Sequence, residues 1–305
     1  NNIYLFNLKI KKKYKKIKIP YLFKQVFDNF KPSVIHSHLD QSDFFTYLTK
    51  KIFGFHSIKF IRTLHNNGLI SRIPIYFHRQ IFKTFDHTIS CSNSVKKDFQ
   101  LQEFSHLINS IPNGIDISNV PLKKPSINSK TNLLHIGSFT KRLGELQKAQ
   151  DNIIHSLLYC RELDFTVTFL GSGDELERIK DLSKQLKVES KVKFCGLVTD
   201  VTSYMNEADA FIMPSRFEGL PIAGIEAVTF GLPIICSDIP AFYRFEPIPE
   251  LVSEVDDVKA LAKSISFFSE NKNEIQKSAI KKRDYFRNKF DIKYTAENYL
   301  KKYHK

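Results

Sequence analysis

The sequence alternates short apolar runs with longer amphipathic segments, and this alternation constrains the fold more than any other feature. The short runs have the length and composition of buried strands, and the segments between them carry the apolar spacing of helices. Such alternation indicates βαβ units arranged around a parallel sheet. In the first series, the predicted strands are 32–38, 57–64, 87–91 and 107–111, and the predicted helices are 41–53 and 73–85.

A second series follows the segment 121–130, which is rich in proline, serine and lysine and is typical of a linker. Its predicted strands are 133–136, 165–170, 192–194, 210–213 and 233–236, and its predicted helices are 150–163, 175–186, 222–230 and several from 258 onward. A chain of 305 residues is long enough for two domains of about 150 residues each. We therefore predict an α/β protein with two Rossmann-like domains facing a cleft, residues 1–120 and 131–305.

Composition and cysteine spacing exclude several classes of protein. A hydrophobic content of 42% with 26% charged residues is typical of soluble globular chains. No run of about 18 apolar residues without charge is present, which argues against a membrane-spanning helix. The four cysteines are scattered without a C-x-x-C pair, which speaks against a disulfide framework or a zinc site and fits the cytoplasm. The chain begins with Asn1 and runs at once into an apolar stretch, so we expect that N-terminal sequence is missing.

The net charge of +14 is concentrated in the first part of the chain. Residues 1–120 hold 18 Lys and Arg against 7 Asp and Glu, and the density is highest from Lys11 to Lys18. Such asymmetry indicates either a solvated basic loop or contact with an anionic partner. Among such partners we favour an anionic membrane surface, at the inner face of the plasma membrane, over nucleic acid, because no aromatic-interleaved motif accompanies the charge.

The segment 214–238 (PSRFEGLPIAGIEAVTFGLPIICSD) carries the strongest chemical signal. Glu218 precedes a predicted helix and Glu226 lies about one turn inside it. Gly219 permits close approach of a ligand to the backbone, and the free N–H groups of the helix start favour a diphosphate. Glu226 can accept hydrogen bonds from two ribose hydroxyls, and Glu218 from a sugar hydroxyl. On spacing alone, two exposed glutamates stabilised by the helix dipole remain an alternative.

This segment resembles the E-x7-E signature of the retaining family 4 glycosyltransferases, which have the two-domain GT-B fold. Further pieces resemble the family in its own order: PSVIHSH at 32–38, TLH at 63–65, ISCS at 89–92, PNGID at 112–116, LGSG at 170–173, VKFCG at 192–196 and the closing crossover helix at 290–303. The family opens with a strand and a glycine-rich loop that have no match here. The resemblance therefore implies an N-terminal domain that is truncated.

The resemblance also implies roles for individual residues. Glu218 would contact the donor sugar near the reacting carbon, and Glu226 would bind the nucleotide ribose. His65 would contact the donor sugar and assist the transfer, and His38 would lie nearby on the acceptor side. The sugar and phosphate pocket would be lined by Gly219, Leu220 and Pro221.

The family binds the diphosphate with a basic pair, an arginine just after a glycine and a lysine farther on. Here Gly137 is followed by Ser138 at the arginine position, so Arg142 or Lys141 would supply the missing charge. Lys148 matches the family lysine.

The activity that the resemblance implies is transfer of a hexose to a glycan or lipid-linked acceptor with retention, in surface polysaccharide synthesis. The donor it implies is UDP-linked, because UDP-hexose is the family's commonest donor. No D-x-D motif follows a predicted strand, so we expect neither a metal nor another cofactor. Two alternatives stay open. One is an inactive relative that binds nucleotide or membrane, and the other is a sugar-nucleotide epimerase or phosphorylase on the same architecture.

Overall fold

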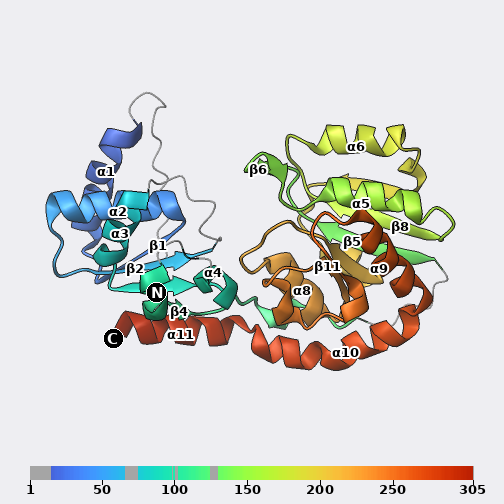
Figure 1. The fold of residues 1–305 in the computed structure, drawn as a ribbon. Helices are drawn as coiled ribbons and strands as arrows, with labels where there is room; N and C mark the ends of the chain where they lie inside the picture. Colours follow the sequence, from blue (N-terminus) through green and yellow to red (C-terminus); the bar gives the residue numbers. More distant parts are fainter. Residues whose placement is uncertain (1–14, 66–74, 98, 100–101, 124–129, 305) are drawn as a thin grey trace. The chain divides into compact units, whose positions relative to one another are not determined.

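The computed structural model describes residues 15–65, 75–97, 99, 102–123 and 130–304. The chain divides into two compact units: unit 1 is Asn1–Ile111 with Tyr299–Lys305, and unit 2 is Pro112–Asn298. Each unit contains a parallel sheet with helices packed on it (Figure 1). The predicted α/β class with two Rossmann-like units is confirmed.

This division differs in two places from the predicted domains. It falls between Ile111 and Pro112, before the 121–130 segment, and it assigns residues 299–305 to unit 1. The physical reason for the second difference is that Tyr299 and Tyr303 pack on the sheet of unit 1, against a cluster that contains Ile61 and Ile89.

Unit 1 has a four-stranded parallel sheet in the order β1-β2-β3-β4. The strands are β1 (Val34–His38), β2 (Lys59–Leu64), β3 (His87–Ser90) and β4 (Asn109–Ser110), and the helices are α1 (Lys15–Phe30), α2 (Asp40–Phe53), α3 (Ile75–Thr84) and α4 (Asn93–Lys97). The strands and helices predicted for this part are confirmed, with shifted ends. Helices α1, α2 and α3 lie on one side of the sheet, and the end of α11 (Ile292–His304) lies on the other (Figure 1).

The basic stretch Lys11–Lys18 is only partly described. Lys15–Lys18 form the first turn of α1, which the sequence did not predict, and Lys11–Tyr14 lie outside the described residues. Contact of this stretch with a membrane therefore stays a prediction. Within the described part of the chain, no helix is both long and apolar enough to cross a membrane.

His36 joins the last helix to the sheet of unit 1. Its Nδ1 atom lies 2.7 Å from the Tyr303 hydroxyl, and its Nε2 atom lies 2.8 Å from the Thr63 hydroxyl. Burial, followed by the neighbouring His38 and His65 rings, lowers the pKa of His36 to about 4. The imidazole is therefore neutral at physiological pH and can accept and donate one hydrogen bond each.

Unit 2 has a six-stranded parallel sheet in the order β12-β11-β10-β5-β8-β9. The strands are β5 (Thr131–Ile136), β8 (Phe165–Leu170), β9 (Val192–Gly196), β10 (Ala210–Met213), β11 (Ile234–Ser237) and β12 (Val252–Ser253). The helices are α5 (Gln150–Ser156), α6 (Leu176–Gln185), α7 (Thr202–Glu207), α8 (Ile222–Phe230), α9 (Val258–Glu270) and α10 (Lys272–Lys289). The predicted helix 150–163 is shorter than expected, because it ends at Ser156 and continues only as a 3₁₀ turn, Leu157–Tyr159.

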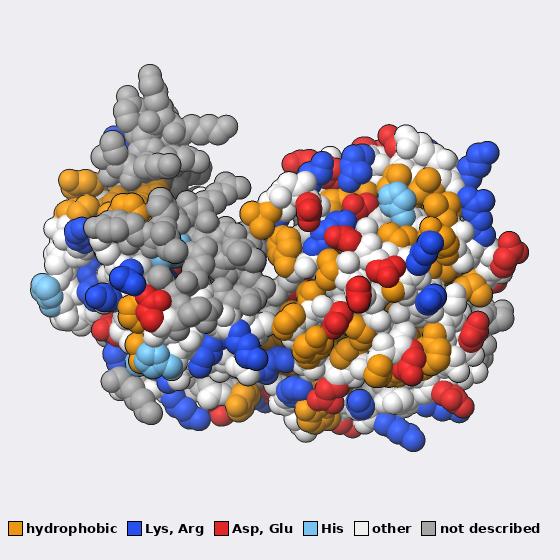
Figure 2. Space-filling model, viewed as in Figure 1, with side chains coloured by type: hydrophobic (Ala, Val, Ile, Leu, Met, Phe, Trp, Pro, Cys, Tyr) orange, Lys and Arg blue, Asp and Glu red, His pale blue; other side chains and the backbone are white. Residues whose placement is uncertain are grey.

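The core of unit 2 lies where α5, α6 and α9 pack on the sheet. Its fully buried side chains include Ile153, Phe169, Ile179, Ile212 and Ile265. On the face of unit 2 drawn in Figure 2, acidic and basic side chains are interspersed. This mixture fits the small charge excess of the second part of the sequence.

The strand order of unit 2 reverses beside β5. From β5 the chain builds outward through β8 and β9, and it then returns to β10, on the other side of β5, and continues through β11 and β12. In open parallel sheets, ligands bind outside the carboxyl ends of the strands at such a reversal. The segments after Ile136 and after Met213 are therefore where a ligand site is expected.

We expect unit 1 to lose stability as the pH falls from 6.5, the ordinary histidine pKa, toward about 4, the pKa of folded His36. Between these values the unfolded chain binds a proton that the folded protein does not, so acid favours unfolding. Thermal melting of the full chain across this range measures the effect. His36→Gln should flatten the pH dependence, whereas His56→Gln, at an exposed position of unit 1, should leave it intact. Equal slopes for both variants would contradict this account.

Candidate functional site

Lys148 and Glu218 meet at the carboxyl ends of the adjacent strands β5 and β10. The Lys148 Nζ atom lies 2.6 Å from Glu218 Oε1, and Glu218 is only 7% exposed. Gln147 donates from Nε2 to the second carboxylate oxygen of Glu218 at 3.4 Å and to the carbonyl of Phe217 at 3.0 Å. The structure thus brings together two residues that the sequence assigned separately to the diphosphate and to the sugar.

Glycines allow the close packing around Lys148. A Cβ atom on Gly137 would lie 2.9 Å from Lys148 Cγ and 3.1 Å from His135 Nε2. Gly171 has a φ of +140°, and a Cβ atom there would lie 2.0 Å from the Gly137 carbonyl oxygen. Any side chain at either position would push this lysine or the strand end away.

The loop after β10 leads directly into α8, which carries Glu226. Gly219, Leu220 and Pro221 are buried, and the Leu220 carbonyl accepts a hydrogen bond from Asn113 Nδ2 at 3.0 Å. Pro221 is the N-cap residue of α8 and no side chain caps this end, so its first N–H groups are suited to an anionic ligand. Glu226 is half-buried, and burial raises the pKa of its carboxyl group.

Ser138 and Arg142 are not part of the contact between Lys148 and Glu218. Ser138 is exposed, and its hydroxyl lies 2.8 Å from that of Thr140. Arg142 is exposed on a small hairpin of β6 (Lys141–Arg142) and β7 (Glu145–Leu146). Which basic residue binds phosphate stays a prediction, although Lys148 is the one fixed in the site.

In unit 1, His38 and His65 form a hydrogen-bonded pair. His38 ends β1, and His65 directly follows the neighbouring parallel strand β2. His38 Nδ1 lies 2.8 Å from His65 Nε2. Burial lowers the pKa of both rings, and for His65 the neighbouring His38 lowers it further. The pair is therefore neutral at physiological pH. The assignment of these rings to sugar and acceptor rests on the resemblance alone.

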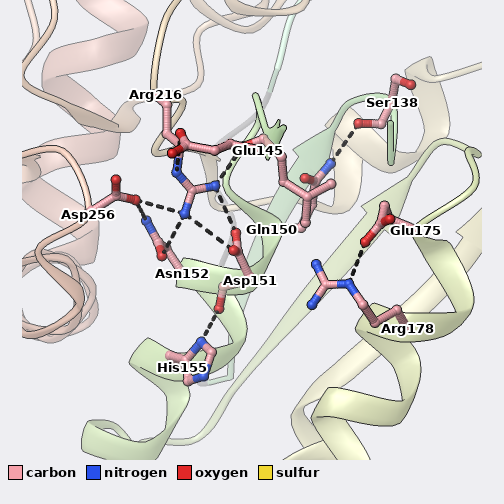
Figure 3. A network of polar contacts seen from close by, with 11 residues as sticks. Ser138, Glu145, Gln150, Asp151, Asn152, His155, Glu175, Arg178, Arg216 and Asp256 are labelled. Atoms are coloured by element: carbon pink, nitrogen blue, oxygen red, sulfur yellow. Dashed lines mark hydrogen bonds and ion pairs between the residues drawn. The ribbon is translucent and has the colours of Figure 1, made fainter. Parts of the chain in front are cut away.

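Two polar residues of unit 2, one buried and one half-buried, were missed by the sequence analysis. His135 lies in β5, its Nδ1 atom bonds to the Ile212 carbonyl at 2.9 Å, and burial lowers its pKa to about 4. Arg216 lies two residues before Glu218 and binds a group of acidic side chains (Figure 3). Arg216 lies inside the segment 214–238, but its acidic partners are distant in the sequence and gave no local signal.

No group of three or more metal-binding side chains is assembled among the residues that the structure describes. The absence of a metal requirement remains a prediction from the sequence.

Comparison with known families decides the identity. The family model described as Glycosyl transferases group 1 matches residues 124–288, which is more than half of the chain. The chain belongs to this glycosyltransferase family. A second model, described as Glycosyltransferase Family 4, matches residues 3–119.

Individual relatives of this glycosyltransferase cover most of it. An uncharacterized glycosyltransferase of Methanocaldococcus jannaschii is 28% identical over an alignment of 278 residues, and the match covers 82% of this chain and 67% of that protein. The O-antigen biosynthesis glycosyltransferase WclY of Escherichia coli is 27% identical over an alignment of 252 residues, and the match covers 78% of this chain and 70% of that protein.

A solved structure shows the same fold. Anabaena Alr3699/HepE, in complex with UDP, is 17% identical and has a TM-score of 0.78, over 93% of this chain and 81% of that one. The glycosyltransferase described here therefore has the GT-B fold, built from two Rossmann-like units.

We expect Lys148→Met to lower the free energy of unfolding of unit 2 by about 3 kcal/mol, because it leaves the buried Glu218 carboxylate without its cation. Adding Glu218→Gln should restore part of this loss, with a coupling of about 1–3 kcal/mol. Urea unfolding of both single variants and the double variant measures it. Lys180→Met, in the exposed pair with Glu177, is the control and should change little. Strictly additive losses would show that the two side chains do not stabilise each other.

Proposed function

We propose that this glycosyltransferase moves a hexose from a nucleotide sugar, with UDP as the nucleotide, to a glycan or lipid-linked acceptor with retention of configuration. The setting we propose is the synthesis of surface polysaccharide. The observation that carries the proposal is the contact of Lys148 with Glu218 at the reversal of the strand order, beside the uncapped start of α8.

These groups have the chemistry that a nucleotide sugar needs. The Lys148 ammonium and the N–H groups of α8 offer fixed positive charge for a diphosphate. Glu218 can accept hydrogen bonds from sugar hydroxyls, and Glu226, half-buried on the same helix, from ribose hydroxyls.

Lys148 and Glu218 neutralise each other when no donor is bound. A diphosphate is the stronger anion, so donor binding would draw the ammonium toward phosphate and leave the carboxylate for the sugar. The site would then replace one ion pair by two new contacts, without leaving a buried charge unpaired.

In the transfer, the acceptor hydroxyl oxygen bonds to the anomeric carbon while the bond from that carbon to the diphosphate breaks. The nucleoside diphosphate leaves with the bonding electrons, and its leaving phosphate oxygen takes up the hydroxyl proton. Lys148 and the start of α8 stabilise the charge that develops on the leaving group. In unit 1, the neutral pair His38 and His65 would contact the sugar and the acceptor side.

Similar proteins support this choice of substrates. WclY is named for O-antigen biosynthesis, and Alr3699/HepE was solved with UDP and with UDP-glucose. A nucleotide-sugar donor and a glycan acceptor are therefore our choice for this chain.

We expect Glu226→Ala to weaken UDP binding by about 1–3 kcal/mol, because the ribose hydroxyls lose their acceptor. Glu218→Gln should keep UDP binding at least as strong as in the wild type, because it releases Lys148 for the diphosphate, while sharply reducing turnover, since this carboxylate faces the sugar. Calorimetry with UDP and a transfer assay over a panel of UDP-hexoses measure the two effects. Weakened UDP binding in Glu218→Gln together with unchanged UDP binding in Glu226→Ala would reject these roles. The absence of binding to UDP, GDP and ADP alike would reject the proposed function.

We also expect transfer to persist in EDTA, because lysine and helix N–H groups supply the positive charge that a metal supplies elsewhere. The measurement is the initial rate after extensive chelation, compared with the rate after addition of manganese or magnesium. Loss of activity on chelation that manganese restores would overturn the expectation.

A further inference from the structure

Arg216 makes an unusually complete set of contacts for a residue on a loop. Its guanidinium donates two parallel hydrogen bonds to the Asp151 carboxylate, at 3.1 Å from Nη1 and 3.2 Å from Nη2, and one at 2.7 Å to the Leu146 carbonyl (Figure 3). Nη2 also lies 3.3 Å from Asn152 Oδ1 and 2.8 Å from Asp256 Oδ1. Asn152 in turn donates to Asp256 at 2.6 Å, which closes the network.

This network fixes one segment of unit 2 against another. Residues 145–152 contain Lys148, and the loop 214–221 contains Glu218. The Arg216 backbone N–H donates to the Gln147 carbonyl at 2.9 Å, so both the main chain and the side chain of Arg216 cross between the two segments. The contact of Lys148 with Glu218 lies between the same two segments.

The electrostatics favour a fixed position for the guanidinium. Its side chain is only 12% exposed, and Glu145 is a third carboxylate within 3.8 Å of Nε. Burial acts to lower the pKa of Arg216, but its hydrogen bonds to Asp151 and Asp256 outweigh this and raise it. Paired hydrogen bonds to a planar carboxylate also fix the orientation of the guanidinium group. A lysine ammonium cannot form this paired contact.

The backbone next to Lys148 needs such support. Ala149 lies in the left-handed region with a φ of +50°, at the start of α5, and no side chain caps this end of the helix. A non-glycine residue in this region is strained and keeps its conformation only when surrounding contacts hold it. The contacts of Arg216 with Leu146 and Asp151 lie on either side of Ala149.

We propose that Arg216 is a positioning residue for the donor site: it holds residues 145–152 against the loop 214–221 and so places the Lys148 ammonium where the donor diphosphate binds. The proposal rests on the proposed function, because it takes Lys148 as the phosphate ligand. Arg216 itself contacts neither Lys148 nor Glu218 through its guanidinium among the described residues, and acts through the segment that it holds.

The test measures UDP affinity of the full chain by calorimetry, with GDP and ADP in parallel. Arg216→Gln should weaken UDP binding about tenfold, and Arg216→Lys should fall between it and the wild type. In a Lys148→Met background, Arg216→Gln should have no further effect, because the group that it positions is gone. The control is Arg287→Gln, which removes a half-buried arginine of unit 2 bonded to the Val120 and Ile117 carbonyls at 2.9 and 2.7 Å. It should not change UDP affinity.

Hydrogen exchange of the unliganded chain provides a second readout. Amides of residues 145–152 should exchange faster in Arg216→Gln than in the wild type and should be unchanged in Arg287→Gln. If Arg216→Gln does not fold, Asp151→Asn replaces it and should shift both readouts in the same direction.

Three results overturn the proposal: wild-type UDP affinity in Arg216→Gln, an equal loss of affinity with and without Lys148, or unchanged exchange of residues 145–152. Failure of the wild type to bind any of the three nucleotides rejects the proposed function. In that case the exchange data still decide whether Arg216 holds the segment.

Discussion

The contact between Lys148 and Glu218 is the interaction on which the candidate site of unit 2 depends. It exists because β5 and β10 are adjacent in the sheet although they are far apart in the sequence, so the segments that follow them meet. Gly137 and Gly171 permit that meeting, since a Cβ atom on either would overlap with Lys148 or with the neighbouring backbone. A charge buried in this way is stable only while it is paired. The site therefore carries an internal ion pair until a ligand supplies other partners.

This arrangement links stability with ligand binding. Desolvated charges cost free energy unless their hydrogen bonds are satisfied, and here each partner satisfies the other. A donor that brings both an anion and hydroxyl groups can replace both contacts at once. The backbone strain at Ala149 is connected with the acidic groups around Arg216, because a strained backbone conformation persists only where other contacts hold it. The Arg216 contacts in the network of Figure 3 thus hold the segment that carries Lys148.

Unit 1 contributes a different kind of chemistry. The polar groups at its strand ends are the neutral imidazoles of His38 and His65, which bond to each other, whereas unit 2 offers fixed charge. Neutral rings can donate and accept hydrogen bonds to sugar hydroxyls without attracting the diphosphate. His36, in the middle of β1, has a structural partner in Tyr303, so it connects this strand with the last helix of the chain. The end of the chain is for this reason part of unit 1.

The sequence by itself determined most of the strands and helices, though not α1, together with the two parallel sheets and the motif with Glu218 and Glu226, because apolar periodicity and turn residues are local properties. The tertiary structure decided which basic residue meets Glu218. The sequence assigned Lys148, together with Arg142 or Lys141, to the diphosphate, and only the order of the strands and the packing around Gly137 brought Lys148 to the Glu218 carboxylate. The role of Arg216 and the place of residues 299–305 depended likewise on partners distant in the chain, and no local pattern records such contacts.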